Sequence, residues 1–242
     1  EIRSNWSFAA IVFRSAGTTR RGSSSPPDRD TDVGKTAVAC AIARQPVAAG
    51  ARVGVYKPAA SGAGTAAPDV VRLWEAAGRP LTPAQVCPQS FAAPIAPPRS
   101  ARAEGRVVDE RLLRDGLEPW WPASDVVVVE GAGGLFSPLG GTLLNVDLAR
   151  EFGLPLVVVD AARLGTIGRT LATVTAARAC GLTIAAVVLS HTQPLAGSLA
   201  DPASPASIAR DSAADLAARL APLPVAVLAH DAARIEPTID FL

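Results

Sequence analysis

Short apolar runs alternate along the chain with longer stretches in which apolar residues recur at helical spacing. The apolar runs are rich in Val and Ile, which favours buried parallel strands. They cover residues 8–13, 52–56, 125–129, 156–159 and 184–189, and the main helical stretches cover residues 35–49, 168–180 and 206–220. This alternation predicts a single α/β domain over residues 1–242, with a doubly wound, mostly parallel sheet flanked by helices.

Two segments interrupt the alternation. Residues 22–30 combine Gly, Ser, Pro and Asp, which is typical of turn-forming chain, so we expect an irregular N-terminal segment up to about residue 29. Residues 94–100 are rich in Pro and are expected to form a surface loop. In doubly wound sheets ligands bind at the carboxyl ends of the strands, so functional residues are sought there.

Composition and charge narrow the function classes. The formal net charge of +1 indicates no nucleic-acid partner, because binding a polyanion needs concentrated basic charge. No apolar run reaches membrane-spanning length, so no membrane association is expected. The three cysteines, Cys40, Cys87 and Cys180, are far apart, which favours neither a metal site nor a disulfide framework. We therefore expect a protein of the reducing cytoplasm.

The most informative motif is Val33-Gly34-Lys35-Thr36, which stands at the start of a predicted helix. A phosphate loop holds phosphate oxygens with backbone N–H groups, neutralises their charge with Lys, and reaches magnesium through a Thr hydroxyl. The usual spacing would place the first glycine of the loop at Arg29, or at Asp28 in a longer form. Neither residue readily adopts the positive φ of that position.

An upstream glycine offers a second interpretation. Gly17-Thr18 follows the first predicted strand, and joining it directly to Asp30 completes a phosphate loop of the longer form. We therefore interpret residues 19–29 as an insertion in the loop, or as an aberration of the sequence itself. On this hypothesis Gly17 contributes to nucleotide binding.

Lysine is rare in this chain. Only Lys35 and Lys57 occur among 23 basic residues, so Arg supplies nearly all other positive charge. Lys57 follows a predicted strand, at the edge where ligands are expected. A compact, mobile ammonium suits a site that handles a small anion, although a solvated lysine at a strand end is the alternative.

Two acidic residues stand near the same predicted edge. Glu130 follows a buried strand and precedes Gly131-Ala132-Gly133-Gly134, where a metal-holding carboxylate belongs in a phosphate-loop fold. The glycines would let backbone approach a ligand closely. Asp69 precedes the helical run 70–77 and is either a second acid of the site or a helix N-cap.

Together these motifs resemble those of the dethiobiotin synthetase family, over about residues 30–190 and more faintly to residue 224. The residues that carry the resemblance are Asp30-Thr31-Asp32-Val33-Gly34-Lys35-Thr36, Tyr56-Lys57-Pro58-Ala59-Ala60-Ser61-Gly62, Asp69, Phe91-Ala92-Ala93-Pro94, Glu130-Gly131-Ala132-Gly133-Gly134 and Leu164-Gly165-Thr166-Ile167. Each motif alone is weakly specific, but their combination in this order is specific.

The resemblance implies a phosphate-loop fold and a homodimeric, cytoplasmic ATP-dependent cyclo-ligase of biotin biosynthesis. Such an enzyme uses ATP and magnesium to convert 7,8-diaminopelargonic acid and CO2 into dethiobiotin through a phosphorylated carbamate. Lys35 and Lys57 would be catalytic. The matching positions would bind nucleotide at Asp32, Val33, Gly34, Lys35 and Thr36, substrate at Thr31, Lys57, Ser61, Gly131, Gly133 and Gly134, and magnesium at Thr36, Asp69 and Glu130.

Three departures from the family pattern keep an alternative open. The first loop glycine is displaced, Gly168 replaces an Asn after Ile167, and Ser190-His191 stands where an Asn usually meets the adenine. A serine hydroxyl cannot pair two edge atoms of a base as an amide can. The alternative is a degenerate nucleotide-binding module that folds but does not turn over.

Overall fold

The computed structural model describes residues 8–14, 33–62 and 68–239. Six parallel strands form the central sheet in the order β2-β5-β1-β6-β7-β8. The strands are β1 (Phe8–Arg14), β2 (Val53–Tyr56), β5 (Val126–Gly134), β6 (Leu156–Ala161), β7 (Ile184–Ser190) and β8 (Val225–Leu228). The predicted doubly wound fold is confirmed, and each of the five predicted strands is present. Residues 17, 31 and 32 and the suspected insertion 19–29 lie outside the described residues, and the single-domain organisation stays a prediction.

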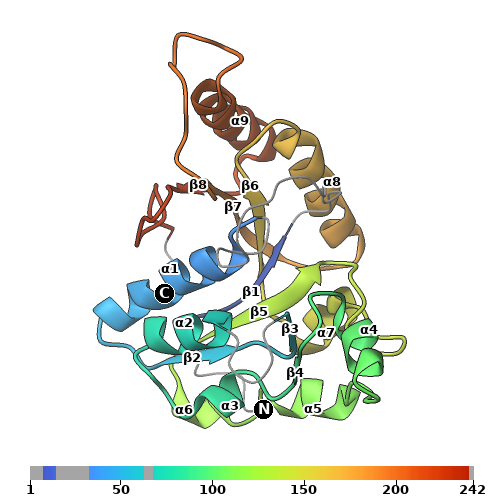
Figure 1. Cartoon of the computed structure of the whole chain (residues 1–242). Coiled ribbons are helices and arrows are strands. Elements are labelled where there is room, and N and C mark those ends of the chain that lie inside the picture. The colour runs from blue at the N-terminus through green and yellow to red at the C-terminus, as the bar shows by residue number, and fades with distance from the viewer. Residues whose placement is uncertain (1–7, 15–32, 63–67, 240–242) are drawn as a thin grey trace.

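Helices cover both faces of the sheet (Figure 1). The longer ones are α1 (Lys35–Ala48), α2 (Pro68–Ala76), α7 (Asn145–Phe152), α8 (Thr166–Ala179) and α9 (Pro205–Leu220). The chain moves along the sheet in one direction from β1 to β2, and in the opposite direction from β5 through β8. Because such crossovers are right-handed, α1 lies on one face and α7, α8 and α9 lie on the other.

Short elements connect β2 to β5 at one end of the sheet. They are β3 (Ala60–Ser61), α3 (Pro83–Val86), β4 (Ser90–Phe91), α4 (Pro97–Ala103), α5 (Glu110–Asp115) and α6 (Trp120–Ala123), with β3 and β4 paired in parallel. The surface-loop prediction for residues 94–100 is wrong in its second half, because α4 begins at Pro97. Proline suits the first turn of a helix, where its missing N–H has no partner to lose.

The core lies where the strands are covered by helices on both faces. Val127, Val158 and Val188, on three different strands, are fully buried, as expected for parallel strands that read as continuous apolar runs. The small side chains of Ala39 and Ala43 let α1 lie close against the sheet. This packing fixes the start of α1 relative to the strand ends that carry the site.

The glycine segment after Glu130 differs from expectation. It continues β5 as strand through Gly134 rather than forming a loop. The register with β1 shifts between the pairs Val12–Glu130 and Arg14–Gly134, which marks a bulge, and Gly133 has φ +83°. Glu130 therefore lies inside a strand, where the backbone on both sides holds it in place.

Among the described helices, none is both long and apolar enough to cross a bilayer.

Candidate active site

The site lies at the carboxyl ends of β2 and β5, beside the first turns of α1 and α2. These elements bring together Lys35, Thr36, Lys57, Asp69 and Glu130. Lys57 follows β2, Glu130 lies in β5, and the other three residues are in the first turns of the two helices. The structure thus brings together five residues that the sequence singles out, and the roles predicted for them stay predictions.

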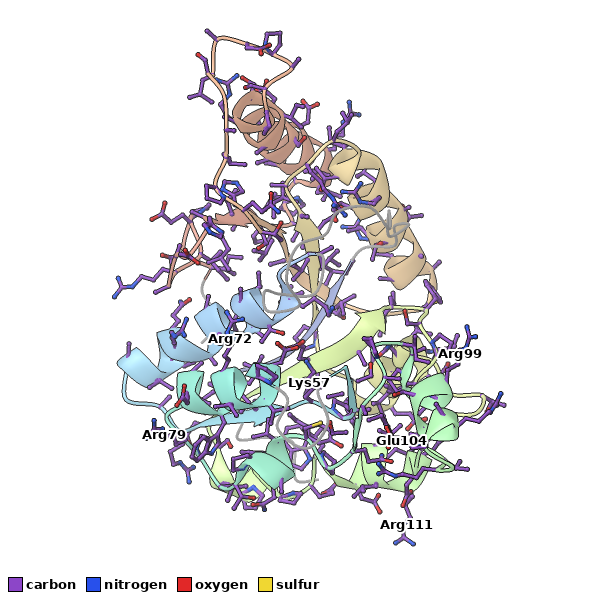
Figure 2. The ribbon with its side chains drawn as sticks, in the orientation of Figure 1. Lys57, Arg72, Arg79, Arg99, Glu104 and Arg111 are labelled. Carbon is purple, nitrogen blue, oxygen red and sulfur yellow. The ribbon has the colours of Figure 1, made fainter. Side chains whose placement is uncertain are left out.

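Lys57 is the centre of the cluster. Its Nζ lies 3.0 Å from Asp69 Oδ2 and 2.9 Å from Glu130 Oε1, and 7% of its side chain is exposed. Figure 2 shows Lys57 in the interior, beside α2 and the ribbon of β5. Burial alone would lower the pKa of Lys57, but the charges of Glu130 and Asp69 outweigh burial and raise that pKa. Lys57 is therefore a fixed ammonium and not a solvated strand end.

The pKa of Asp69 is shifted in the opposite direction. Burial would raise its pKa, but Lys57 in particular, with Arg72 and Lys35, outweighs burial and lowers the pKa. Asp69 lies in the first turn of α2, which begins at Pro68, and its carboxylate binds Lys57. The N-cap interpretation of Asp69 is therefore wrong, and the alternative interpretation as a second acid of the site is retained.

Glu130 uses only one of its two carboxylate oxygens. Its Oε1 accepts hydrogen bonds from Thr36 Oγ1 at 2.9 Å and from Lys57 Nζ at 2.9 Å. Its Oε2 is buried without a hydrogen-bond partner among the described residues, and 1% of the Glu130 side chain is exposed. A buried carboxylate oxygen with no partner is costly, and a bound cation would satisfy it.

This donor set fits magnesium. Hard oxygen ligands from Thr36, Asp69 and Glu130 are of the type that magnesium prefers, with water and phosphate oxygens completing the coordination. In the part of the chain that is described, no group of three His, Cys, Asp or Glu side chains could hold a metal ion by itself. The arrangement therefore suits a metal that arrives with a nucleotide better than a permanently bound ion.

Gly34 anchors the end of the phosphate loop. It is the N-cap of α1 with φ +75°, a conformation that L side chains rarely adopt. A Cβ on Gly34 would also collide with Oγ of Ser190 at the end of β7. Val33 and Lys35 on either side are buried, with 4% of each residue exposed. The loop end is thus packed against β7 and directs the first N–H groups of α1 toward the strand ends.

A cavity of about 420 Å³ opens beside these groups. Its lining includes the predicted substrate residues Lys57, Ser61, Gly131 and Gly133. Gly134 is not in the lining, and its N–H donates to Ser137 Oγ at 2.9 Å. The role predicted for the Gly134 backbone therefore has no support in this geometry.

Sequence reasoning missed two parts of the cavity wall. One is Ser137, which binds the end of the glycine segment, and the other is the apolar stretch from Pro94 to Pro97. The Phe91-Ala92-Ala93-Pro94 motif pointed toward this stretch, but no spacing rule indicates that it faces Lys57.

A second cavity of about 400 Å³ lies at the ends of β7 and β8, against Ala37 of α1. Ser190, His191 and His230 line it, so the residues that replace the expected Asn face a common space. The pKa of His191 is lowered by burial and by the nearby His230. Gly168, which stands where the family has an Asn after Ile167, lies in α8, and an added Cβ there would meet open space.

Sequence reasoning also missed Asp160. This fully buried residue near the end of β6 accepts a hydrogen bond from Thr166 Oγ1 at 2.9 Å and forms an ion pair with Arg169 Nε at 3.0 Å. The Asp160 side chain thereby fixes the first turn of α8. A single acid that follows the apolar run 156–159 was the available signal.

Comparison with known proteins is consistent with this geometry. A family described as an AAA domain matches residues 29–228. The chain is 45% identical to an ATP-dependent dethiobiotin synthetase of Rhodopirellula baltica over 180 residues, which is 67% of this chain and 70% of that protein. It is 42% identical to the protein of the same name from Anaeromyxobacter sp. strain Fw109-5 over 196 residues, which is 79% of this chain and 86% of that protein.

A third relative has the same name. The ATP-dependent dethiobiotin synthetase of Bacillus cereus is 42% identical over 163 residues, which is 66% of this chain and 67% of that protein. The identity in all three relatives extends over most of the chain. This chain therefore belongs to the dethiobiotin synthetase family.

Proposed function

We propose that this chain is an ATP-dependent dethiobiotin synthetase, a cyclo-ligase that uses ATP and magnesium to close a ureido ring. Its substrates are 7,8-diaminopelargonic acid and CO2, and its products are dethiobiotin, ADP and phosphate. The observation that carries the proposal is the contact of Lys57 with both Asp69 and Glu130, directly beside Thr36 of the phosphate-loop helix. That arrangement joins an anion-handling lysine to a metal-nucleotide site.

The reaction consists of three steps whose atoms balance. One amine of the substrate attacks CO2 and loses a proton, which gives a carbamate. A carbamate oxygen then attacks the γ-phosphorus of ATP, and ADP leaves. Finally the second amine attacks the carbamoyl carbon and loses a proton, and phosphate leaves as the ring closes.

The nucleotide side of the site would be built by the start of α1. Backbone N–H groups from Val33 onward would hold phosphate oxygens, and the Lys35 ammonium would neutralise charge on the transferred phosphoryl group. Thr36, Asp69 and Glu130 would hold magnesium, which supplies charge neutralisation on the phosphates. The orphaned Oε2 of Glu130 supports this assignment.

The substrate side would be built by Lys57 and its neighbours. Lys57 and Ser61 border the same cavity as Gly131 and Gly133, and together they would hold the carbamate against the nucleotide. Phosphoryl transfer of this kind depends on positioning and on charge neutralisation more than on covalent help from the protein. Two buried ammonium groups that face one cavity provide both.

A homodimer is part of the proposal. Phe136, just after β5, and Leu164, between β6 and α8, are large apolar side chains that are 47% and 80% exposed. A second copy covering this end of the sheet would bury them. Light scattering of the purified protein tests this, and a monomer at micromolar concentration would contradict it. Cys40, Cys87 and Cys180 form no disulfide with one another, and reduced cysteines suit the cytoplasm that the proposal assigns.

The direct test is product formation. Purified protein is incubated with diaminopelargonate, bicarbonate, magnesium and ATP, and dethiobiotin is measured by mass spectrometry, with Lys35→Ala and Lys57→Ala as controls. We expect the wild type to form dethiobiotin and both variants to lose at least about a hundredfold in rate. ATP binding without any dethiobiotin would overturn the proposal.

A further inference from the structure

The Lys57 ammonium forms ion pairs with Asp69 and Glu130, the two carboxylates that the proposed function assigns to the metal. Its Nζ contacts one oxygen of Asp69 at 3.0 Å and one of Glu130 at 2.9 Å, so a single ammonium bridges both acids. All three side chains are largely shielded from water, with 7% of Lys57, 27% of Asp69 and 1% of Glu130 exposed. Charges at such separations interact more strongly there than on the surface.

The charged side chains that line the cavity beside Lys57 already balance one another without a metal. Among the described residues that line it, the charged ones are Lys35, Lys57, Asp69 and Glu130, and their formal charges sum to zero. A divalent cation entering alone would add two positive charges beside two buried ammonium groups. A cation entering with the anionic phosphates of a nucleotide would not carry this penalty.

We propose that Lys57 is an internal counter-ion that competes with the divalent metal for Asp69 and Glu130, so that metal-nucleotide binding releases its ammonium toward the substrate side of the cavity. The inference rests on the proposed function and deepens it, because it implies an order of events. Lys57 remains bound to the metal-site acids until the metal-nucleotide arrives. Only then is its ammonium available to the carbamate next to Ser61.

The geometry of Glu130 gives this exchange a starting point. Oε1 is shared by Thr36 and Lys57, whereas the buried Oε2 has no partner among the described residues. A cation that binds Oε2 therefore breaks no existing hydrogen bond of Glu130. Further approach to Asp69 then displaces the ammonium, since both cations need the same carboxylates.

Removing the lysine charge should therefore strengthen binding of a metal without nucleotide. Manganese serves as the probe, and free Mn²⁺ is measured by electron paramagnetic resonance in wild type, Lys57→Met and Lys57→Gln. We expect either variant to bind Mn²⁺ at least about tenfold more tightly than wild type in the absence of nucleotide. Arg99→Met is the matched control, because it removes an exposed positive charge that points away from the site in Figure 2, and it should leave Mn²⁺ affinity unchanged.

A wild-type measurement covers the case in which the Lys57 variants do not fold. The chain has only two lysines, so selective ¹³Cε-lysine labelling gives two signals, which Lys35→Arg distinguishes. With ADP already bound, the addition of Mg²⁺ should shift the Lys57 signal. A Lys57 signal that does not move, or a Mn²⁺ affinity that is unchanged or weaker in folded Lys57→Met, overturns the inference.

Failure of the inference and failure of the proposed function give different results. If the metal site is elsewhere, Glu130→Gln leaves Mn²⁺ binding in the presence of ADP unchanged, and both proposals fall. If Glu130→Gln weakens that binding but Lys57→Met does not strengthen binding without nucleotide, the metal site stands and the competition alone is wrong.

Discussion

Thr36 Oγ1 donates a hydrogen bond to Glu130 Oε1 over 2.9 Å, joining side chains that are 94 positions apart in the sequence. The contact connects the first turn of α1 to β5 across the end of β1. It forms because the sheet order puts β5 beside β1 and right-handed crossing lays α1 over both strands. The fold therefore holds the first turn of α1 next to Glu130, the acid of the proposed metal site.

Replacing Glu130 by Gln tests the charge of this acid. The amide oxygen can still accept from Thr36 and Lys57, so the shape is preserved while the negative charge is lost. We expect the rate of dethiobiotin formation to fall by about 10²–10³-fold and the magnesium concentration for half-maximal rate to rise. Steady-state rates at varied magnesium measure both, and a rate within a factor of two of wild type would contradict the assignment.

The Lys57–Asp69 pair predicts a particular dependence of stability on pH. The folded-state pKa of Asp69 is lowered, so its contribution is present above the ordinary value of 3.8 and is lost as pH falls through the folded value. The pKa of Lys57 is raised, so its contribution is present below the ordinary value of 10.5 and is lost as pH rises through the folded value.

Urea denaturation of wild type and Asp69→Asn checks this expectation. The difference in the free energy of unfolding between the two proteins should be constant between about pH 5 and pH 9 and should shrink below pH 4. The variant Asp125→Asn, which removes the acid of an exposed ion pair with Arg52, is measured in the same way as an example of an acid outside the site. A difference between wild type and Asp69→Asn that grows as the solution is acidified would contradict the lowered pKa of Asp69.

Gly34→Ala tests the anchoring of the loop end. Alanine would have to adopt φ +75° and would press its Cβ against the Ser190 hydroxyl. We expect a loss of about 1–3 kcal/mol in stability and at least about tenfold weaker ATP binding. Thermal unfolding and calorimetric titration measure these effects. The double variant Gly34→Ala/Ser190→Gly should recover only the part due to the collision, so complete recovery would show that backbone strain is unimportant.

Arg169→Met tests the ion pair at the start of α8. Without Arg169, the buried Asp160 keeps the Thr166 hydroxyl and the Ala161 N–H but loses its opposite charge. We expect a destabilisation of about 3 kcal/mol, measured by urea denaturation. The further change Asp160→Asn should restore part of the loss, and no recovery in the double variant would contradict the ion-pair explanation.

Much of the fold was predictable because parallel strands buried on both faces read as continuous apolar runs. Residues 126–129 and 156–159 are such runs, and both form strands at the centre of the sheet. The glycine segment after Glu130 was not predictable as strand, since Gly has low strand propensity and only the ends of the segment, Glu130 and Gly134, pair with β1. Pro97 was misassigned because proline suits both loops and first helical turns.

The site was predictable in its charged residues but not in its contacts. Lys57 and Glu130 were found because each follows a buried apolar run and because lysine is rare in the chain. Their direct pairing depends on side-chain directions at the end of β2 and inside β5, two strands that are neighbours only in the folded sheet. The roles of Ser137 and Asp160 likewise arise from contacts across the fold, which no local spacing encodes.

The proposed insertion gives a prediction for the N-terminal segment. Deletion of residues 19–29 joins Gly17-Thr18 to Asp30 and completes the phosphate-loop pattern. ATP should then bind at least about tenfold more tightly, because a first loop glycine allows backbone N–H groups to surround the phosphates. Calorimetric titration of both chains measures this. Unchanged or weaker binding in a folded deletion variant would show that the segment is not an interruption.

In the proposed reaction, this site phosphorylates a carbamate oxygen and then expels phosphate as the ring closes. Single-turnover reactions with ¹⁸O-labelled CO2 test it most directly, because the phosphorylated oxygen comes from CO2 and leaves with the phosphate. We predict dethiobiotin together with one ¹⁸O atom in each phosphate released, and loss of both products in Lys57→Ala. Unlabelled phosphate, or ADP release without dethiobiotin, would show that the site does not phosphorylate a carbamate on the way to the ring.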